Sequence, residues 1–472
     1  MNRFLYFYTL RLTGNLNTEE FYRPNQCVGI LGAWPLAVYC LELSVAVALR
    51  VPQQFRKLRP IYRSFLGFKP SEALEPLART VSSSGKCLMY REFSKWLIIM
   101  TAVLGMTSAA NSADPEKFRV YFGTYSGQLS KGIYVSTFDA TTGQLSPPEL
   151  ATEVKNASFV AIHPTRKYLY AVSEIADFEG KKQGGVSAFT IDPASGRLKL
   201  LNQQSSGGGG PCHLVTDAQG KNVLVANYGG GSVSVLPILA DGKLAPSSST
   251  IQHRGSSVDK QRQEGPHAHS INLDAANKFA FAADLGLDKV LIYRFDGGKG
   301  LLTANDPPAG IVSPGSGPRH FAFHPTGKYA FVNNEMTSTV TSFAYDPAKG
   351  SLTEIHTLST IPEPTPGNST AETVVHPSGE YVYVSNRGHN SLAMYQCDAA
   401  TGRLTSIGNQ STGGKTPRNF NIDPTGRYVL AANQDTNNVV VLKVDLATGK
   451  LSPTGTTIEV GTPVCVRFVS LQ

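Results

Sequence analysis

Phe321-Ala-Phe-His324-Pro-Thr-Gly-Lys328-Tyr-Ala-Phe-Val-Asn-Asn-Glu335 is the stretch of sequence that decides the fold. Apolar residues alternate on both sides of a His-Pro-Thr-Gly segment, which predicts two strands joined by a tight turn. The pattern returns about fifty residues later as Val374-Val-His376-Pro-Ser-Gly-Glu380-Tyr-Val-Tyr-Val-Ser-Asn-Arg387. The chain is therefore built from an internal repeat.

The same turn occurs in six complete units. Its marker residues are Lys167, Lys221, Lys278, Lys328, Glu380 and Arg427. A third alternating run follows each pair of strands and ends in Asp-Pro-x-x-Gly-x-Leu or a near relative, as at Asp346-Pro-Ala-Lys-Gly-Ser-Leu352. Each unit therefore holds four strands, and the spacing of roughly fifty residues is typical of propeller blades.

A seventh unit is divided between the two ends of the repeat region. Residues 118–150 supply three strands, and Val464–Val469 supplies the missing first strand. Pairing these segments closes the ring and removes the open edges of a linear array. We predict an all-β fold, a seven-bladed β-propeller with four-stranded blades that is closed by strands from the N- and C-terminal ends.

Composition and charge exclude several classes of protein. Apolar residues make up 41 % and charged residues 17 % of the 472 residues, so the chain can bury a core and is not mostly disordered. The net charge of +8 is concentrated at the front, where residues 1–113 hold 13 basic and 6 acidic residues. The rest of the chain is nearly neutral, which argues against a nucleic-acid partner.

We expect three segments, 1–88, 89–113 and 114–472, of which the last is the propeller. The middle segment follows the order of a secretory signal peptide, with a weakly basic start at Met89–Lys95, an apolar run at Trp96–Met106 and small residues after it. Its apolar run is too short to span a bilayer. The propeller is therefore expected to be exported, periplasmic or secreted, and otherwise cytoplasmic if this segment is not used.

Two interpretations of the first segment stay open. Met89 is the true start in one, and residues 1–88 are then upstream sequence added by a misplaced start. In the other, Cys27–Leu49 is a membrane helix, against which the presence of Pro35 and Glu42 counts. The propeller domain itself is not expected to insert into a membrane.

The cysteines and the recurrent histidines receive structural interpretations. Cys212, Cys397 and Cys465 have no metal-ligand or disulfide spacing, so we expect small buried side chains, and we expect neither a metal nor a cofactor. A histidine or an aspartate occupies the same place in every turn, and we interpret all six as polar turn-formers. These residues are His163, Asp217, Asp274, His324, His376 and Asp423.

The repeat also predicts which residues share one rim of the channel, because the first strand starts and the second ends on the same face. The residues five before the turn histidine or aspartate are Ser158, Cys212, His269, Arg319, Ala371 and Arg418. The residues seven after the marker are Glu174, Tyr228, Leu285, Glu335, Arg387 and Gln434. These positions differ between units and include acids, bases and a histidine, which indicates one asymmetric site on a repeated scaffold.

Four of these residues come from three successive units and form the predicted catalytic set: His269, Arg319, Glu335 and Arg387. The two guanidiniums suit a carboxylate or phosphate, and either the glutamate or the histidine could activate water. A rim of salt bridges is the structural alternative. The predicted substrate-binding residues are Glu174, Tyr228, Arg418 and His267, the last a loop residue that supports His269.

The chain resembles the lactonase family of seven-bladed β-propellers over residues 118–470. The resemblance rests on Gly265-Pro-His-Ala-His-Ser270, Asp284-Leu-Gly-Leu-Asp-Lys289, Gly315-Ser-Gly-Pro-Arg-His-Phe-Ala-Phe-His-Pro325 and Val332-Asn-Asn-Glu335. That family includes propeller-type 6-phosphogluconolactonases and a fungal enzyme that interconverts carboxymuconate and its lactone. Its His, two Arg and Glu match the four predicted catalytic residues.

The resemblance implies a carboxylic ester hydrolase that opens a small anionic sugar lactone, 6-phosphogluconolactone to 6-phosphogluconate, without a metal. A carboxymuconate cyclase using the same arginines is one alternative. A non-catalytic exported binding propeller is another. Replacement of the rim residues and assays of both chemistries discriminate among the three.

Overall fold

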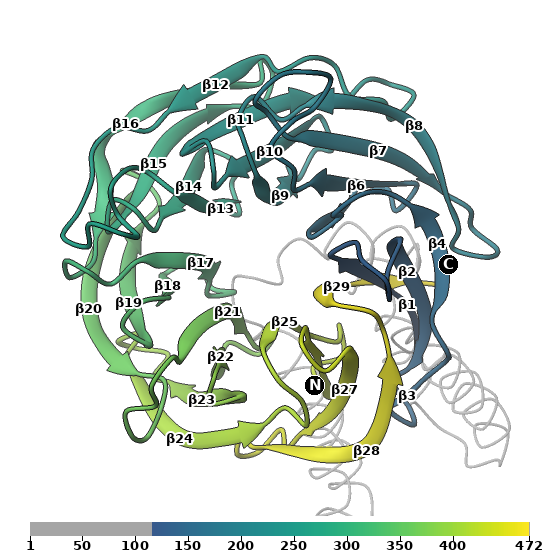
Figure 1. The fold of residues 1–472 in the computed structure, drawn as a ribbon. Coiled ribbons are helices and arrows are strands. Elements are labelled where there is room, and N and C mark those ends of the chain that lie inside the picture. The colour runs from purple at the N-terminus through teal and green to yellow at the C-terminus, as the bar shows by residue number, and fades with distance from the viewer. Residues whose placement is uncertain (1–115, 472) are drawn as a thin grey trace, which may run out of the picture. The chain divides into compact units, whose positions relative to one another are not determined.

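The computed structural model describes residues 116–471, which form seven antiparallel sheets arranged in a ring (Figure 1). The predicted seven-bladed propeller with four-stranded blades is confirmed. The segments 1–88 and 89–113, with the predicted signal peptide and the alternative membrane helix, lie outside the described residues. Within 116–471, no helix has the length and apolar character needed to cross a membrane.

We number the blades along the chain. Blade 1 contains β1 (Lys117–Thr124), β2 (Gly132–Asp139), β3 (Gln144–Leu145), β4 (Glu149–Glu153) and the C-terminal β29 (Pro463–Ser470). Blade 2 contains β5 (Val160–Ile162), β6 (Tyr168–Ser173), β7 (Gly185–Ile191) and β8 (Leu198–Ser205). Blade 3 contains β9 (Pro211–Thr216), β10 (Asn222–Asn227), β11 (Ser232–Pro237) and β12 (Ser249–Gln252). Blade 4 contains β13 (Ala268–Leu273), β14 (Phe279–Asp284), β15 (Lys289–Asp296) and β16 (Leu301–Ile311).

The last three blades follow the same order. Blade 5 contains β17 (Pro318–Phe323), β18 (Tyr329–Asn334), β19 (Thr339–Asp346) and β20 (Ser351–Ser359). Blade 6 contains β21 (Ser369–Val375), β22 (Tyr381–Arg387), β23 (Ser391–Cys397) and β24 (Leu404–Ser411). Blade 7 contains β25 (Pro417–Ile422), β26 (Tyr428–Asn433), β27 (Asn438–Val444) and β28 (Leu451–Glu459). In blades 2 to 7 the first strand along the chain lies innermost, around the central channel, and in blade 1 β29 takes this place (Figure 1).

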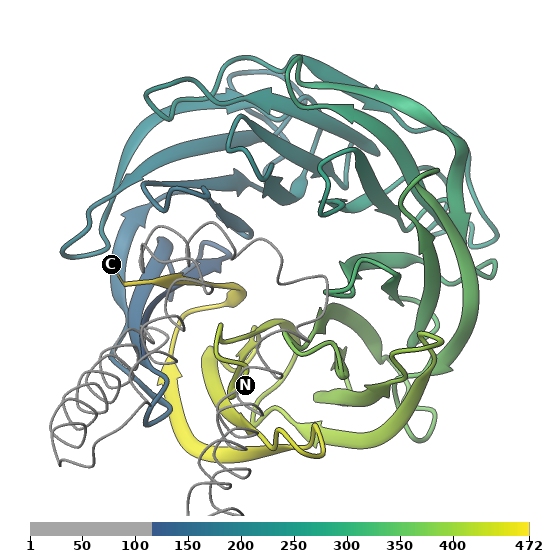
Figure 2. The same ribbon diagram turned by 180° about the vertical axis from the view of Figure 1, so that it is seen from behind.

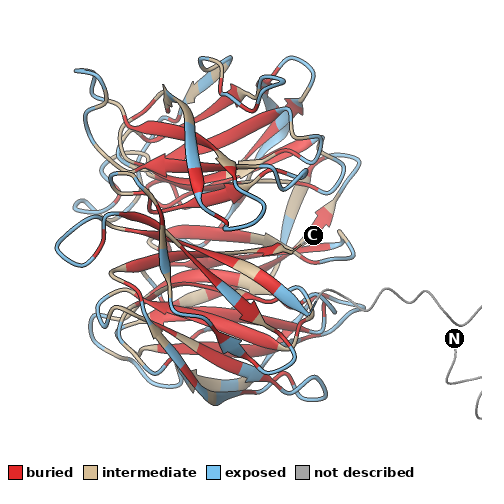
Figure 3. Cartoon of the chain, turned by 90° about the vertical axis from the view of Figure 1, so that its right-hand side faces the viewer, coloured by how far each residue is buried: buried red, intermediate tan, exposed pale blue. Residues whose placement is uncertain are grey.

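The core lies between adjacent blades rather than inside any one of them. Phe281 of blade 4 and Phe343 of blade 5 are fully buried in one cluster. Middle strands such as β10, β14 and β18 are buried along their whole length because another sheet covers each of their faces. Exposed residues concentrate in the connecting turns and loops (Figure 3).

The ring is closed as predicted, by pairing of β29 with β1. Antiparallel partners run from Phe118 opposite Ser470 to Gly123 opposite Cys465. The two strands lie side by side although they come from opposite ends of the described chain (Figure 2). The outer strand of this blade is broken into β3 and β4, because Pro147 and Pro148 between them have no N–H to donate to β2.

The turn histidines connect neighbouring blades. The Nδ1 atom of each histidine forms a hydrogen bond with a hydroxyl group in its own turn. Its Nε2 atom forms a second hydrogen bond, to a glycine carbonyl in the corresponding turn of the next blade. These contacts are His163 to Gly220 at 2.9 Å, His324 to Gly379 at 2.9 Å and His376 to Gly426 at 2.8 Å. Their predicted place in the turns is confirmed.

Candidate functional site

A β-bulge near the start of the innermost strand carries the rim residues. The register between β13 and β14 shifts at His269, and the register between β25 and β26 shifts at Arg418. The shift between β17 and β18 spans two residues, Arg319 and His320. A bulge re-aims side chains that strict alternation would place on the sheet face. The repeated bulge therefore directs one or two side chains per blade toward the channel.

Glu335 is the centre of the predicted catalytic set. It follows the end of β18, and its Oε2 lies 3.0 Å from Nε of Arg319 and 2.9 Å from Nη2 of Arg387. Its Oε1 lies 2.7 Å from Nη2 of Arg262, which comes from the loop before β13. Three guanidiniums from three different parts of the chain thus hold one buried carboxylate.

These ion pairs determine the protonation of the carboxylate. Burial alone would raise the pKa of Glu335, but Arg387, Arg319 and Arg262 lower it to about 2. Burial and repulsion by Arg387 and Arg418 lower the pKa of Arg319 to about 10. At neutral pH the carboxylate is ionised and a weak base, and Arg319 is still a cation.

His269 lies in the same part of the channel but outside this ion-pair network. It lines a small cavity together with Arg319 and Arg418, and it is only 5 % exposed. Burial, aided by the positive charge of Arg319, lowers the pKa of His269 well below its usual range. The imidazole is therefore neutral at neutral pH and can accept a proton.

Two of the predicted substrate-binding residues, Glu174 and Arg418, also line this small cavity. Glu174 accepts hydrogen bonds from the hydroxyl of Tyr125, at 3.0 Å to Oε2, and from Oγ of Ser158. Arg418 stacks over the Tyr125 ring with its guanidinium carbon 5.5 Å from the ring centre. Among the described residues, no carboxylate lies within ion-pair distance of Arg418, so its N–H groups are available to a ligand.

Tyr228 and His267 lie at the edge of the site, beside the loop that precedes β13. Their rings stack with centroids 4.6 Å apart, and Tyr228 meets the ring of His269 edge to face at 5.1 Å. Nδ1 of His267 lies 3.1 Å from the Tyr228 carbonyl oxygen. His267 therefore contacts Tyr228, which in turn packs against His269.

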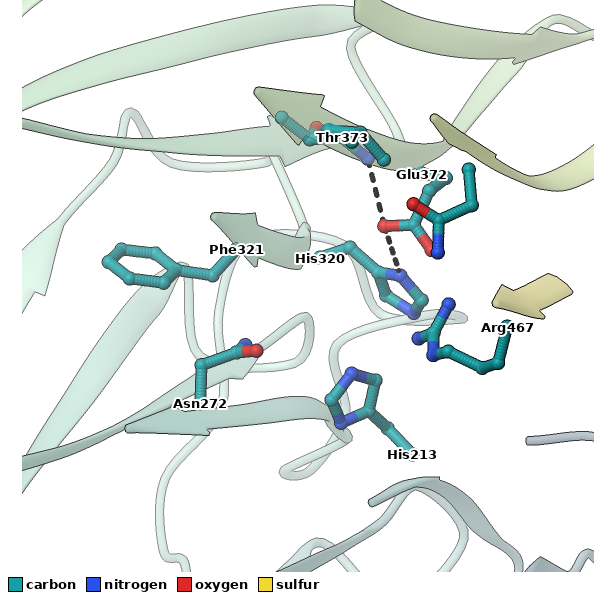
Figure 4. Close-up of a pocket in the computed structure, with 9 residues that line it drawn as sticks. His213, Asn272, His320, Phe321, Glu372, Thr373 and Arg467 are labelled. Carbon is teal, nitrogen blue, oxygen red and sulfur yellow. Dashed lines mark hydrogen bonds and ion pairs between the residues drawn. The ribbon is translucent and has the colours of Figure 1, made fainter. Parts of the chain in front are cut away.

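A second cavity, of about 180 Å³, lies farther along the channel toward the turns (Figure 4). His320 lines both cavities, and its Nδ1 lies 2.9 Å from Oε1 of Glu372. Burial raises the pKa of Glu372, whereas burial and the positive charge of Arg319 lower the pKa of His320. His213 and Arg467 point toward His320 across this cavity (Figure 4).

The three cysteines of the propeller are free and buried, as expected. Sγ of Cys212 lies 3.6 Å from Nδ1 of His269. Burial raises the pKa of the Cys212 thiol, which keeps it protonated and unreactive at neutral pH. In residues 116–471 no group of three or more His, Cys, Asp or Glu side chains has a metal-binding arrangement.

The family model described as lactonase, 7-bladed beta-propeller, matches residues 119–468. The chain belongs to this lactonase family. A relative from Bacillus subtilis (strain 168), named 6-phosphogluconolactonase, is 39 % identical over 354 residues, which cover 75 % of this chain and 99 % of the relative. A second protein of that name, from Formosa agariphila, is 35 % identical over 61 % of this chain and 81 % of its own length.

Solved structures agree with the family assignment. The periplasmic gluconolactonase of Pseudomonas aeruginosa is similar to this lactonase-family chain with a TM-score of 0.71 and 33 % identity. The match covers 75 % of this chain and 100 % of that structure. The fold, the ring of blades and the extent of the propeller are thus shared with a complete relative.

All eight predicted site residues lie at or beside the channel of this lactonase-family propeller. Three further residues of the site, Tyr125, His320 and Arg262, were not predicted from the repeat. Tyr125 follows β1 as Glu335 follows β18, so applying the rim register to the divided blade would have found it. His320 was missed because alternation places it opposite Arg319, and the two-residue bulge overrides alternation. Arg262 lies in a loop that has no counterpart in the repeat.

Proposed function

We propose that this protein hydrolyses a sugar lactone that bears an anionic group, with 6-phosphogluconolactone as its substrate and 6-phosphogluconate as its product. The observation that carries the proposal is the pairing of a buried neutral imidazole, His269, with guanidiniums that line the same cavity. Relatives named 6-phosphogluconolactonase and a structural neighbour named gluconolactonase support the choice of reaction.

His269 serves as the general base in the proposed mechanism. It takes a proton from water as the water oxygen attacks the lactone carbonyl carbon, and Arg319 or Arg418 stabilises the resulting oxyanion. The ring C–O bond then breaks, and the departing oxygen takes the proton back from His269. The immediate product is one open chain with a carboxylic acid and a hydroxyl group, and the acid then releases its proton to solvent to give the carboxylate, so atoms and protons balance.

Glu335 has a different role in this proposal. A carboxylate with a pKa of about 2, held by three guanidiniums, is a poor base at neutral pH. It instead fixes the orientation of Arg319 and Arg387 through Oε2. In this proposal the base is therefore His269, which lies outside the ion-pair network of Glu335.

The test compares two variants, His269→Gln and Glu335→Gln, with fresh 6-phosphogluconolactone and with spontaneous hydrolysis subtracted. Loss of a general base costs about 100-fold or more, so His269→Gln should lower kcat by this amount and remove the pH dependence that the imidazole causes. Glu335→Gln should lower activity but keep that pH dependence. A His269→Gln variant with wild-type kcat, or a wild-type protein that converts carboxymuconate and no sugar lactone, contradicts the proposal.

We also propose that the propeller is exported by means of residues 89–113. The structural neighbour from Pseudomonas aeruginosa is named a periplasmic gluconolactonase, which supports export of a protein with this fold. Fractionation of cells that express residues 89–472 or 114–472 tests it. Lactonase activity should appear outside the cytoplasm only for the longer chain, and equal cytoplasmic activity for both chains contradicts export.

A further inference from the structure

The loop between β12 and β13, residues 253–267, is firmly attached beside the site. Nδ1 of His253 lies 2.6 Å from Oδ2 of Asp284. Gln263 is fully buried, and its Nε2 donates to the Leu285 carbonyl at 2.8 Å and to Oδ1 of Asp288 at 2.9 Å. The residue before this buried glutamine is Arg262, whose backbone position is thereby fixed.

Arg262 places its guanidinium at the entrance to the site. Nη2 lies 2.7 Å from Oε1 of Glu335 and 3.4 Å from the hydroxyl of Tyr228. The Arg262 side chain is 45 % exposed, whereas those of Arg319 and Arg387 are 2 % and 13 % exposed. Arg262 is therefore the outermost cation of the cluster, and its other N–H groups face solvent beside the buried arginines.

The charges of the site suit a dianion. Four guanidiniums, those of Arg262, Arg319, Arg387 and Arg418, face two carboxylates, those of Glu174 and Glu335. The excess of two positive charges matches a phosphate monoester, which carries roughly −1.5 to −2 at neutral pH. One carboxylate on a substrate would neutralise only half of this excess.

We infer that Arg262 is the residue that selects lactones bearing a terminal phosphate monoester. The inference rests on the proposed function. With the ring ester directed toward His269, a phosphate on the exocyclic carbon at the other end of the sugar extends toward Arg262, because Tyr228 contacts both Arg262 and His269. Arg262 meets it there with a planar set of N–H donors that fits phosphate oxygens. Glu335 holds the guanidinium in place before the substrate arrives, and Gln263 fixes the backbone next to Arg262.

The test measures kcat/KM for 6-phosphogluconolactone and for unphosphorylated glucono-δ-lactone in three variants. Arg262→Gln should lower the ratio of the two values at least tenfold, mainly through KM for the phosphorylated lactone. Arg262→Lys should keep part of the preference because it keeps the charge but loses the planar fork. Lys260→Gln, an exposed cation two residues away, is the control and should leave the ratio within twofold of wild type.

Two results overturn the inference. An equal loss for both lactones assigns Arg262 to positioning Glu335, and kcat/KM values that stay at the wild-type level for both lactones remove Arg262 from the site. If wild-type protein hydrolyses neither lactone, the proposed function fails, and calorimetry with 6-phosphogluconate still decides the role of Arg262. Binding that is at least tenfold weaker in Arg262→Gln, with no such change for gluconate, supports phosphate recognition, and equal binding by the two proteins refutes it.

Discussion

At the scale of single residues, the site depends on backbone bulges that the repeat itself conceals. Counting from the turn located Arg319 and His269 because their strands, β17 and β13, have the same length of six residues, so position along the strand could be inferred. The face of the sheet on which a side chain lies could not be inferred, because the bulge at Arg319 and His320 turns both side chains toward the channel. The position of Arg262 could not be predicted for another reason. Its loop has no counterpart in the repeat, so counting residues from the turn does not place it relative to the channel.

The first residue-scale prediction concerns Arg319. Replacement by alanine removes the ion pair with Glu335 and the hydrogen bond to the Ala371 carbonyl, and with them one of the two guanidiniums proposed to stabilise the oxyanion. Loss of one such donor costs about 100-fold or more in kcat. Steady-state kinetics should show this loss while circular dichroism shows a folded propeller. Unchanged turnover would remove Arg319 from the mechanism.

The second residue-scale prediction concerns pH. Burial and Arg319 lower the pKa of His269, so the imidazole stays neutral well below pH 6.5. A protonated imidazole cannot accept a proton, and kcat/KM should therefore fall only as pH drops through this lowered value. The acid limb of the profile, measured from pH 4 to 8 with spontaneous hydrolysis subtracted, should have its midpoint below 6.5. A midpoint at or above 6.5 would show that another group is titrating.

At the scale of elements, the blade is the unit that sequence reasoning recovers best. Four alternating runs and two kinds of turn recur often enough for each copy to support the others, and six blades were delimited from these signals. The outer strand of blade 1 was less predictable, because Pro147 and Pro148 interrupt it and leave β3 with two residues. The contacts between turns of neighbouring blades were also not foreseen, since they join residues more than fifty positions apart.

One such contact yields an element-scale prediction. His324→Ala removes the hydrogen bond to the Gly379 carbonyl and leaves that buried acceptor without its partner, at a cost of about 1 to 3 kcal/mol. The unfolding midpoint in denaturant should fall accordingly. Lactonase kcat/KM should stay at the wild-type value, because the turn lies at the end of β17 opposite the rim. Lys328→Ala, at an exposed position in the same turn, is the control.

A large change in kcat/KM for His324→Ala would contradict the structural assignment of the turn histidines. A midpoint equal to that of Lys328→Ala would show instead that the contact between blades 5 and 6 contributes nothing to stability.

At the scale of the whole molecule, seven blades form one cooperative ring because each sheet is covered on both faces by its neighbours. The sequence repeat predicted the number of blades and the closing strand, including its partner. It could not predict the shape of the channel, which contains two neighbouring cavities that are both lined by His320. Cavity shape depends on side-chain packing across blades, for which a repeat of turns carries no information.

The meeting of the two ends predicts that the ring tolerates new termini. The Leu471 N–H lies 3.4 Å from the Lys117 carbonyl oxygen, so a short Gly-Ser linker can join them. A circular permutant that begins in the exposed turn between β23 and β24 should fold and keep its activity, because this turn lies away from the rim. Circular dichroism and lactone hydrolysis check this. Deletion of residues 463–472 is the comparison and should prevent folding, since it exposes the edge of β1.

The pairing of β1 with β29 also sets the timing of folding during synthesis. The strand that completes blade 1 is the last strand of the propeller to be synthesised, so the ring cannot close before β29 has left the ribosome. Until then β1 has no inner neighbour, and the native contacts with the greatest sequence separation are still unmade. The same contact that stabilises the finished propeller thus postpones its completion until its last strand has been made.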